Sequence, residues 1–230
     1  MQILIAALYN YNVMKALITG TSQGIGKATA ELFLKNNIQV IGVDVSKASI
    51  LHKDYQHFQC DISDFREPFK DLDYIVHNAG IQEGENVLKT NLISTMKLDK
   101  YYRELNPNLK ADTFNTSISG VYGDEFPDYV ASKAGLNGYV KFVAKQMMPK
   151  GIANAVCFGG VVTELNKPVI ENAETWKKLM EINPLKRWAS AEEAAEWIYF
   201  VTVVNRFATG QLFEIDGGEN SCPESTFIWI

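Results

Sequence analysis

The amino-acid sequence predicts an α/β fold, a doubly wound parallel sheet of about seven strands with helices on both faces. Short apolar runs alternate with longer segments of helical periodicity, which is the pattern of parallel strands connected by helices. A glycine-rich segment follows the first run and precedes the first helix, as in nucleotide-binding sheets. The predicted strands are Lys15–Thr19, Gln39–Asp44, His57–Cys60, Tyr74–His77, Thr113–Ser117, Ala153–Phe158 and Gln211–Ile215.

Five segments carry apolar residues at helical spacing. Pro149 and Gly151 end the third of them, and Ser190 with Glu193 forms a capping box before the last. The predicted helices are Gly24–Leu34, Val87–Leu105, Tyr129–Met148, Ala173–Ile182 and Ala194–Val204. We expect a single domain over residues 14–219, with a substrate lid at about 163–188, an N-terminal extension over 1–13 and a tail over 220–230.

The composition excludes several classes of partner. The formal net charge of −5 makes the surface as a whole repel nucleic acid and anionic membranes. The apolar run Ile3–Leu8 is too short to span a bilayer. Cys60, Cys157 and Cys222 form no CxxC pair, so we expect free thiols in a reducing compartment and a cytoplasmic protein.

The histidines give no indication of a metal site. His52, His57 and His77 lack metal-ligand spacing, and no acidic cluster accompanies them in the sequence. We therefore expect no bound metal.

The glycine-rich segment after the first strand predicts a phosphate-binding loop. Glycine lets the backbone approach a pyrophosphate closely, and the following helix N-terminus presents free N–H groups and a partial positive charge. The segment stands between a strand and a helix, which is the context that the motif requires. The residues expected to bind the cofactor here are Gly20, Ser22, Gln23, Gly24, Ile25 and Gly26.

Asp44 ends the second predicted strand and indicates NAD(H) as the cofactor. A carboxylate there can accept the ribose hydroxyls and repel a 2′-phosphate, and Gln23 adds no positive charge for such a phosphate. Lys47 keeps NADP(H) open as the alternative. Asp61 and Ile62 are expected at the adenine.

A second group of polar residues is expected at the same edge of the sheet. Asn78, Ala79 and Gly80 follow the fourth strand, where their backbone and amide groups can line the cofactor cleft. They reinforce the phosphate loop because they follow it in the expected order.

Tyr129 and Lys133 are four residues apart in a predicted helix, so their side chains share one face. A nearby cation stabilises the phenolate and lowers the tyrosine pKa, giving an acid/base group usable nearer neutral pH. Ser117 ends the fifth strand, twelve residues before the tyrosine. Its hydroxyl could hold a substrate carbonyl against the phenol.

From about residue 14 to 219 the sequence resembles the short-chain dehydrogenase/reductase family, of the type called classical, which has a Rossmann-like sheet. The residues that carry the resemblance are Thr19, Gly20, Gly24 and Gly26 of the glycine loop, Asn78-Ala79-Gly80, Asn91, Tyr129 and Lys133. Asn183-Pro184-Leu185 and Asp216-Gly217-Gly218 are similar to the family's C-terminal landmarks.

This resemblance implies a proton relay of four residues. Tyr129 would exchange the proton with the substrate oxygen, while Lys133 would lower its pKa and bind the nicotinamide ribose. Ser117 would polarise the carbonyl, and Asn91 would hold a water that links Lys133 to solvent. Thr163 would contact the nicotinamide carboxamide.

The sequence departs from the family pattern at several positions. The serine usually precedes the tyrosine by one residue more, so Ser119 and Thr116 are alternatives to Ser117. Phe158 replaces the usual proline after the sixth strand, and His77 replaces a usual asparagine. The stretches from Asp61 to Asn78 and from Asn78 to Asn91 are shorter than usual, so the flanking helices and the oligomer interface are expected to differ.

The function expected from these residues is hydride transfer between nicotinamide and a small alcohol or ketone. One alternative is a nucleotide-binding regulatory protein without catalysis, and another is an epimerase or dehydratase on the same fold. Tyr129, Lys133 and Asn91 together favour the oxidoreductase. We also expect a homotetramer or homodimer, because two long apolar helices could pack across a two-fold axis.

Overall fold

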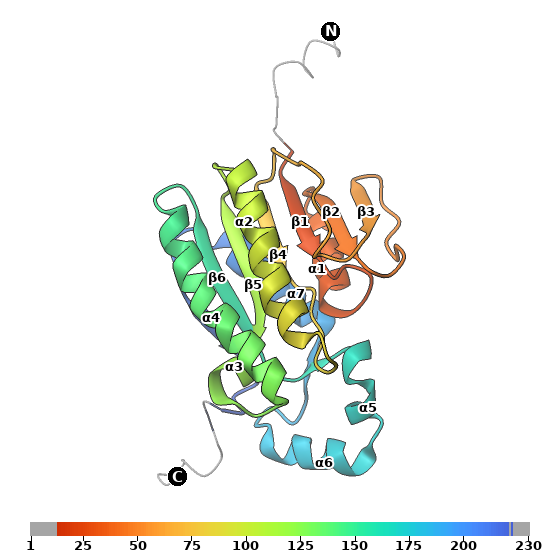
Figure 1. Cartoon of the computed structure of the whole chain (residues 1–230). Coiled ribbons are helices and arrows are strands. Elements are labelled where there is room, and N and C mark those ends of the chain that lie inside the picture. Colours follow the sequence, from red (N-terminus) through yellow and green to blue (C-terminus); the bar gives the residue numbers. More distant parts are fainter. Residues whose placement is uncertain (1–12, 221, 223–230) are drawn as a thin grey trace.

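The computed structural model describes residues 13–220 and 222, and these form one seven-stranded parallel sheet with helices on both faces (Figure 1). The strand order is β3-β2-β1-β4-β5-β6-β9, which confirms the predicted doubly wound sheet. The strands are β1 (Lys15–Thr19), β2 (Gln39–Asp44), β3 (Tyr55–Gln59), β4 (Tyr74–His77), β5 (Ala111–Ser117), β6 (Ile152–Phe158) and β9 (Leu212–Ile215). Each lies within two residues of its predicted bounds.

Helices α1 (Gly24–Lys35) and α7 (Ala191–Tyr199) pack together on one face, whereas α2 (Thr95–Leu105) and α4 (Pro127–Met147) cover the other (Figure 1). The short helices α3 (Ser119–Tyr122), α5 (Lys167–Ile170) and α6 (Ala173–Ile182) lie beyond the carboxyl ends of the strands. Strand order reverses beside β1, which pairs with β2 on one side and β4 on the other. Ligands bind in the crevice outside such a switch point.

Two of the predicted helices differ from the structure by more than two residues or in helix type. The segment predicted as Val87–Leu105 begins with a π-helical stretch, Lys89–Ser94, and π-helical turns are frequent at functional sites. Helix α7 begins three residues earlier than predicted, because the Ser190 hydroxyl accepts the Glu193 N–H at 3.1 Å and places the cap directly before it.

The structure also contains two short strands that the sequence analysis does not predict. The short strands β7 (Val161–Val162) and β8 (Ala189–Ser190) pair with each other, and two residues each are too few to give a periodic signal. Residues 1–12 of the predicted N-terminal extension, and most of the predicted tail, lie outside the described residues.

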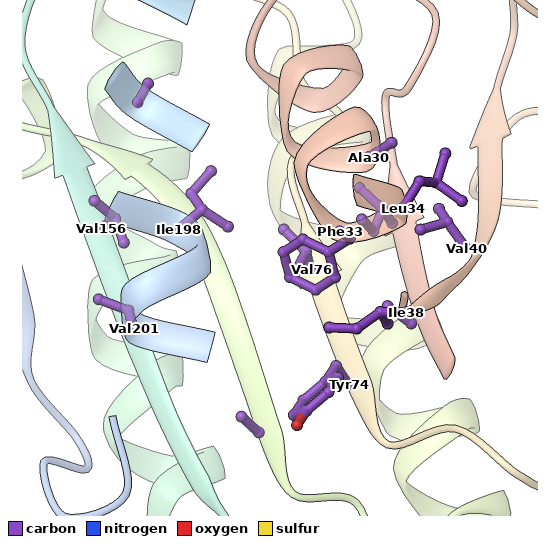
Figure 2. Close-up of a cluster of buried hydrophobic side chains, with 14 of the residues drawn as sticks. Ala30, Phe33, Leu34, Ile38, Val40, Tyr74, Val76, Val156, Ile198 and Val201 are labelled. Atoms are coloured by element: carbon purple, nitrogen blue, oxygen red, sulfur yellow. The ribbon is translucent and has the colours of Figure 1, made fainter. Parts of the chain in front are cut away.

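The core between the sheet and helices α1 and α7 is made of interlocking aromatic and branched side chains (Figure 2). Phe33 is fully buried there. Its ring lies edge-on to Tyr74 and to Tyr199, with centroid separations of 6.4 and 5.4 Å. Phe33 therefore joins α1 to β4 and α7, and it holds the helix whose N-terminus faces the crevice.

Phe33→Ala should lower the free energy of unfolding by about 3–5 kcal/mol, the usual cost of deleting a buried phenylalanine. The matched control is Phe207→Ala, because the Phe207 side chain is 96% exposed and its loss should change stability little. Urea denaturation followed by circular dichroism measures both. Equal effects of the two substitutions would contradict the assigned core.

Candidate active site

The loop between β1 and α1 folds tightly on itself and against the residue after β4. Gly20 and Gly24 have φ values of +74° and +52°, in the left-handed region that favours glycine. A Cβ on Gly26 would lie 2.0 Å from the Gly20 carbonyl oxygen and 2.3 Å from Asn78 Nδ2. Packing of the loop itself thus requires these glycines. The Gln23 side chain makes no cap hydrogen bond at the start of α1, which leaves first-turn N–H groups for an anionic ligand.

Asp44 lies at the carboxyl end of β2, directly beside this loop. Its carboxylate accepts the backbone N–H of Ser22 at 2.9 Å and that of Ser46 at 2.8 Å. Two backbone donors from different segments therefore fix the orientation of the carboxylate. The structure brings Asp44 and the glycine loop together, as the sequence predicts.

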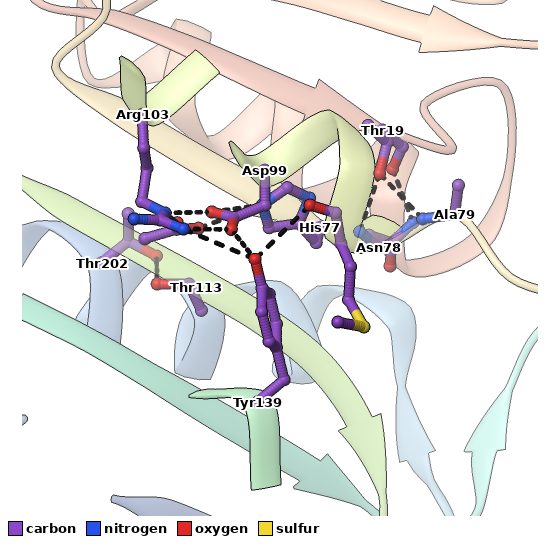
Figure 3. A network of polar contacts seen from close by, with 11 residues as sticks. Thr19, His77, Asn78, Ala79, Asp99, Arg103, Thr113, Tyr139 and Thr202 are labelled. Carbon is purple, nitrogen blue, oxygen red and sulfur yellow. Dashed lines mark hydrogen bonds and ion pairs between the residues drawn. The ribbon is translucent and has the colours of Figure 1, made fainter. Parts of the chain in front are cut away.

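Asn78 ties together the ends of three neighbouring strands. Its backbone N–H donates to Thr19 Oγ1 at 2.9 Å, and its side-chain amide donates to the Thr19 carbonyl at 3.0 Å (Figure 3). The Asn115 amide in turn donates to Asn78 Oδ1 at 2.7 Å. The N–H of Ala79 also binds Thr19 Oγ1, at 3.0 Å.

Lys133 is buried in α4, one turn after Tyr129. Its Nζ lies 5.5 Å from the centre of the Tyr129 ring and donates to the Asn115 carbonyl at 3.0 Å. Burial lowers the pKa of Lys133 to about 8. The shared helix face predicted from the sequence is present.

The environment of Tyr129 differs from the expectation of a lowered pKa. Burial raises the pKa of the phenol, the charge of Glu125 raises it further, and hydrogen bonding with Ser117 opposes this. Burial therefore raises the pKa of Tyr129 and favours its protonated form.

Among the three candidate hydroxyls, Ser117 and Ser119 lie together and Thr116 points elsewhere. The Ser117 hydroxyl donates to Ser119 Oγ at 3.1 Å, whereas Thr116 Oγ1 contacts Cys157 Sγ at 3.0 Å in the buried interior. Side chains alternate along a strand, so Thr116 and Ser117 face opposite sides of the sheet. Thr116, which fits the usual family spacing, therefore lies on the opposite side of the sheet from Ser117.

Asn91 lies in the π-helical segment, and its side chain is bound on all sides. Its Nδ2 donates to the Ile81 carbonyl at 2.8 Å and to Ser132 Oγ at 3.1 Å, and its Oδ1 accepts the Ile81 N–H at 2.9 Å. A Cβ on Gly80 would lie 3.2 Å from Asn91 Oδ1 and 3.7 Å from Lys133 Nζ. Asn91, Gly80 and Lys133 therefore meet at one point.

The remaining predicted residues lie at the same edge in different environments. Asp61 is exposed after β3, and its Oδ1 accepts the Ser63 N–H at 2.8 Å. Ile62 is buried in the apolar core, so only its backbone is available to a ligand. Thr163 lies against the phosphate loop, because a Cβ on Gly24 would lie 3.3 Å from Thr163 Cγ2.

The sequence reasoning missed three residues that contribute to the site. Asn115 supplies the carbonyl that holds Lys133, and Ser132 receives the Asn91 amide. Burial raises the pKa of Glu125, whose charge acts on both Tyr129 and Lys133. A carboxylate four residues before the tyrosine was the available signal for Glu125.

Known proteins are similar to this chain in both sequence and fold. A family model described as enoyl-(acyl carrier protein) reductase matches residues 20–220. The 3-oxoacyl-(acyl-carrier-protein) reductase FabG of Buchnera aphidicola subsp. Schizaphis graminum is 31% identical, over 88% of this chain and 96% of its own. The chain belongs to the short-chain dehydrogenase/reductase family.

Solved structures agree with this short-chain dehydrogenase/reductase assignment. A short chain dehydrogenase family protein from Francisella tularensis is 28% identical, with a TM-score of 0.79 over 90% of this chain and 98% of its own. ElxO, solved with NADP bound, is 26% identical, with a TM-score of 0.81 over 90% of this chain and 98% of its own.

Family membership establishes the general chemistry of this protein. It is an oxidoreductase that binds a nicotinamide cofactor and acts on a small-molecule substrate. The matched segment contains every residue predicted for the proton relay. Within residues 13–220 and 222, no helix has the length and apolar character needed to span a membrane.

The expectation that no acidic cluster accompanies the histidines is wrong for His77. Its Nε2 lies 3.1 Å from Asp112 Oδ1 and 3.9 Å from Asp99 Oδ1, and all three side chains are buried. Figure 3 shows His77 beside Asp99 and Arg103. Each residue offers one ligand atom, and these atoms lie within 4.8 Å of one another. The sequence does not reveal this cluster, because its members come from β4, α2 and β5.

Neighbouring protein groups compensate the charges of the cluster formed by His77, Asp99 and Asp112. Arg103 donates to both oxygens of Asp99, at 2.7 and 2.9 Å, and Tyr139 donates to the same carboxylate. Burial and the charge of Asp99 raise the pKa of Asp112 well above its usual range, while burial lowers the pKa of His77 to about 4. A divalent cation would have to compete with the Arg103 guanidinium and displace the proton on Asp112.

The free energy of unfolding of the wild-type protein should fall with rising pH because of Asp112, and Asp112→Asn should remove this contribution. Folded Asp112 keeps a proton that the unfolded chain, with an ordinary carboxyl pKa, releases above about pH 4. From there up to the folded pKa, the wild-type free energy of unfolding should fall relative to the variant by up to about 1.4 kcal/mol per pH unit. Urea denaturation at pH 5, 6 and 7 measures this difference.

The control for this experiment is Glu104→Gln, because the Glu104 side chain is 67% exposed and should give a curve parallel to wild type. His77 has the opposite pH dependence, since its lowered pKa costs stability as pH falls below about 6.5, but it is present in both proteins. Parallel pH curves for wild type and Asp112→Asn would show that Asp112 holds no proton.

Proposed function

We propose that this protein is an NAD(H)-dependent ketone reductase or alcohol dehydrogenase in which Tyr129 exchanges the proton with the substrate oxygen. The observation that carries the proposal is the meeting of Tyr129, Lys133 and Ser117 at the carboxyl edge of the sheet that also carries the phosphate loop. A substrate carbonyl could receive hydrogen bonds from the phenol and the serine while facing the cofactor cleft.

The residues at this edge fit a nicotinamide dinucleotide. The start of α1 lacks a side-chain cap from Gln23, which suits a pyrophosphate. The Asp44 carboxylate lies beside it and suits the adenosine ribose hydroxyls, and Thr163 lies against the same loop. When bound, the cofactor supplies or accepts the hydride.

The chain's own residues would handle the proton and orient the substrate. The raised pKa of Tyr129 favours its protonated form, which is the form that would donate to a carbonyl oxygen during reduction. Lys133, with a pKa of about 8, would be mostly charged at neutral pH, would stabilise the phenolate left after transfer and would bind the ribose. Ser117 would orient the carbonyl.

Asn91 would organise the relay in a more restricted way than the family resemblance implies. Its side chain already binds Ile81 and Ser132, so we propose that it fixes the loop after β4 against α4. Its backbone or a remaining lone pair would hold the water that links Lys133 to solvent.

A similar protein suggests a substrate class for the proposed reductase. The name of the Buchnera relative describes reduction of a 3-oxoacyl group carried by a protein, so a short 3-oxo ester is the first compound to test. Residues 163–188 would form the lid over the substrate, where Trp176 and Trp188 pack edge-to-face at 5.1 Å.

Tyr129→Phe should keep cofactor binding and lose about 10²–10⁴-fold of turnover, the usual contribution of a positioned acid or base. The ring still fills its place, so the fold should survive. NADH fluorescence titration and single-turnover reduction of a 3-oxo ester measure the two properties separately. Turnover near the wild-type rate would show that α4 is not the catalytic helix.

The serines provide a matched comparison within the same experiment. Ser117→Ala should reduce kcat with little change in NADH affinity, and Ser119→Ala should reduce it less. The reverse order would transfer the substrate-orienting role from Ser117 to Ser119.

The protein should prefer NADH to NADPH, and Asp44→Ala should reduce that preference. A charge-assisted hydrogen bond contributes about 1.5–3 kcal/mol, so the ratio of kcat/KM values should fall roughly 10- to 100-fold. Both cofactors are compared in one assay with one substrate. An NADPH advantage in the wild-type protein would contradict the role of Asp44 and direct attention to Lys47.

A further inference from the structure

A continuous chain of hydrogen bonds runs from the phosphate loop across β2 to β3 and returns to the segment after β2. Thr21 Oγ1 lies 2.8 Å from the Tyr55 hydroxyl oxygen, which lies 2.9 Å from His57 Nδ1. His57 Nε2 lies 2.9 Å from the carbonyl oxygen of Ser46. None of the residues in this hydrogen-bond chain belongs to the proposed proton relay.

The chemistry of these four residues fixes which group donates and which accepts in each hydrogen bond. The Ser46 carbonyl can only accept, so His57 Nε2 must carry a hydrogen and donate. In a neutral imidazole Nδ1 then accepts, and the Tyr55 hydroxyl is its donor. The Tyr55 oxygen is left to accept from Thr21, so each hydroxyl and each ring nitrogen has one defined partner.

The fold makes room for this hydrogen-bond chain at some cost in strand stability. Gly42 in β2 lies beneath it, because a Cβ there would be 2.3 Å from the Tyr55 hydroxyl oxygen and 2.5 Å from Thr21 Oγ1. Glycine weakens a strand interior and often marks a close approach. Burial raises the pKa of Tyr55, so its phenol stays protonated and available as a donor.

At its Ser46 end, the hydrogen-bond chain reaches the Asp44 carboxylate, which faces the proposed cofactor site. Ser46 receives the His57 hydrogen bond at its carbonyl and donates its own N–H to Asp44 Oδ1 at 2.8 Å. The other Asp44 oxygen accepts the Ser22 N–H at 2.9 Å, and the Ser49 hydroxyl donates to the Ser22 carbonyl at 2.7 Å. The position of Asp44 thus depends on where Ser46 is held.

We propose that Tyr55 and His57 are positioning residues for cofactor selectivity, which hold Ser46 and through it the Asp44 carboxylate in the orientation that receives ribose hydroxyls and repels a 2′-phosphate. The inference rests on the proposed role of Asp44. Neither side chain needs to touch the cofactor. Their effect on binding should therefore depend on the group at the ribose 2′ position.

The test is a fluorescence titration of the purified full chain with NADH and with NADPH, which requires no substrate. Tyr55→Phe and His57→Leu should weaken NADH binding roughly two- to tenfold, the change expected for one lost hydrogen bond, and weaken NADPH binding less. The ratio of the two Kd values should therefore move toward one. His57→Gln should restore the wild-type ratio, because its side-chain amide can donate to the Ser46 carbonyl.

Tyr101→Phe is the matched control, since it removes a phenol bonded to the Arg66 carbonyl at 2.8 Å, away from Asp44, and should leave the ratio unchanged. An unchanged ratio in Tyr55→Phe, or equal weakening of both cofactors, would overturn the inference and leave a structural role only. Tyr55→Phe removes a single oxygen, so it decides the matter even if His57→Leu fails to fold. Wild-type protein that binds NADPH more tightly would instead refute the proposed NAD(H) preference, and that is measured first.

Discussion

The hydrogen bonds of Asn78 hold the carboxyl ends of β1, β4 and β5 together, and the site depends on them. Asn78 is half-buried, and its amide and backbone N–H make hydrogen bonds to Thr19 and Asn115 that favour the close fit of the loop around this side chain. Gly20 and Gly26 both leave space for its Nδ2, at 2.8 and 2.3 Å from their missing Cβ positions. Asn78 also orients Asn115, whose carbonyl holds Lys133. One side chain thereby connects the phosphate loop to the proposed catalytic lysine.

A second constraint is the buried charge between the sheet and helices α2 and α4. Two carboxylates and a histidine in a dry interior are costly unless each charge is compensated, and Arg103 and the proton on Asp112 provide that compensation. Tyr139 brings α4 into the same network through Asp99. Because Tyr129 and Lys133 lie on α4 as well, the hydrogen bond that Tyr139 donates to Asp99 also ties this helix to α2.

Much of the site could be predicted because its parts are local. The glycine loop, the aspartate at the end of β2 and the pair Tyr129 and Lys133 each lie within one short segment, whose secondary structure brings the side chains to one face or one strand end. The choice between Ser117 and Thr116 could not be made from spacing alone. Side-chain alternation along β5 places the two hydroxyls on opposite sides of the sheet, and the Thr116 side chain packs against Cys157.

Periodicity and turn chemistry act over a few residues, so the amino-acid sequence alone predicts the succession of strands and helices along the chain, the phosphate loop and the one-turn spacing of Tyr129 and Lys133. The tertiary structure decided how these groups are charged. Burial, which no local pattern measures, keeps Tyr129 protonated and lowers the pKa of Lys133. The tertiary structure also sets the contacts of His77, whose partners Asp99 and Asp112 come from α2 and β5. It likewise brings Thr21 of the phosphate loop to Tyr55 on β3.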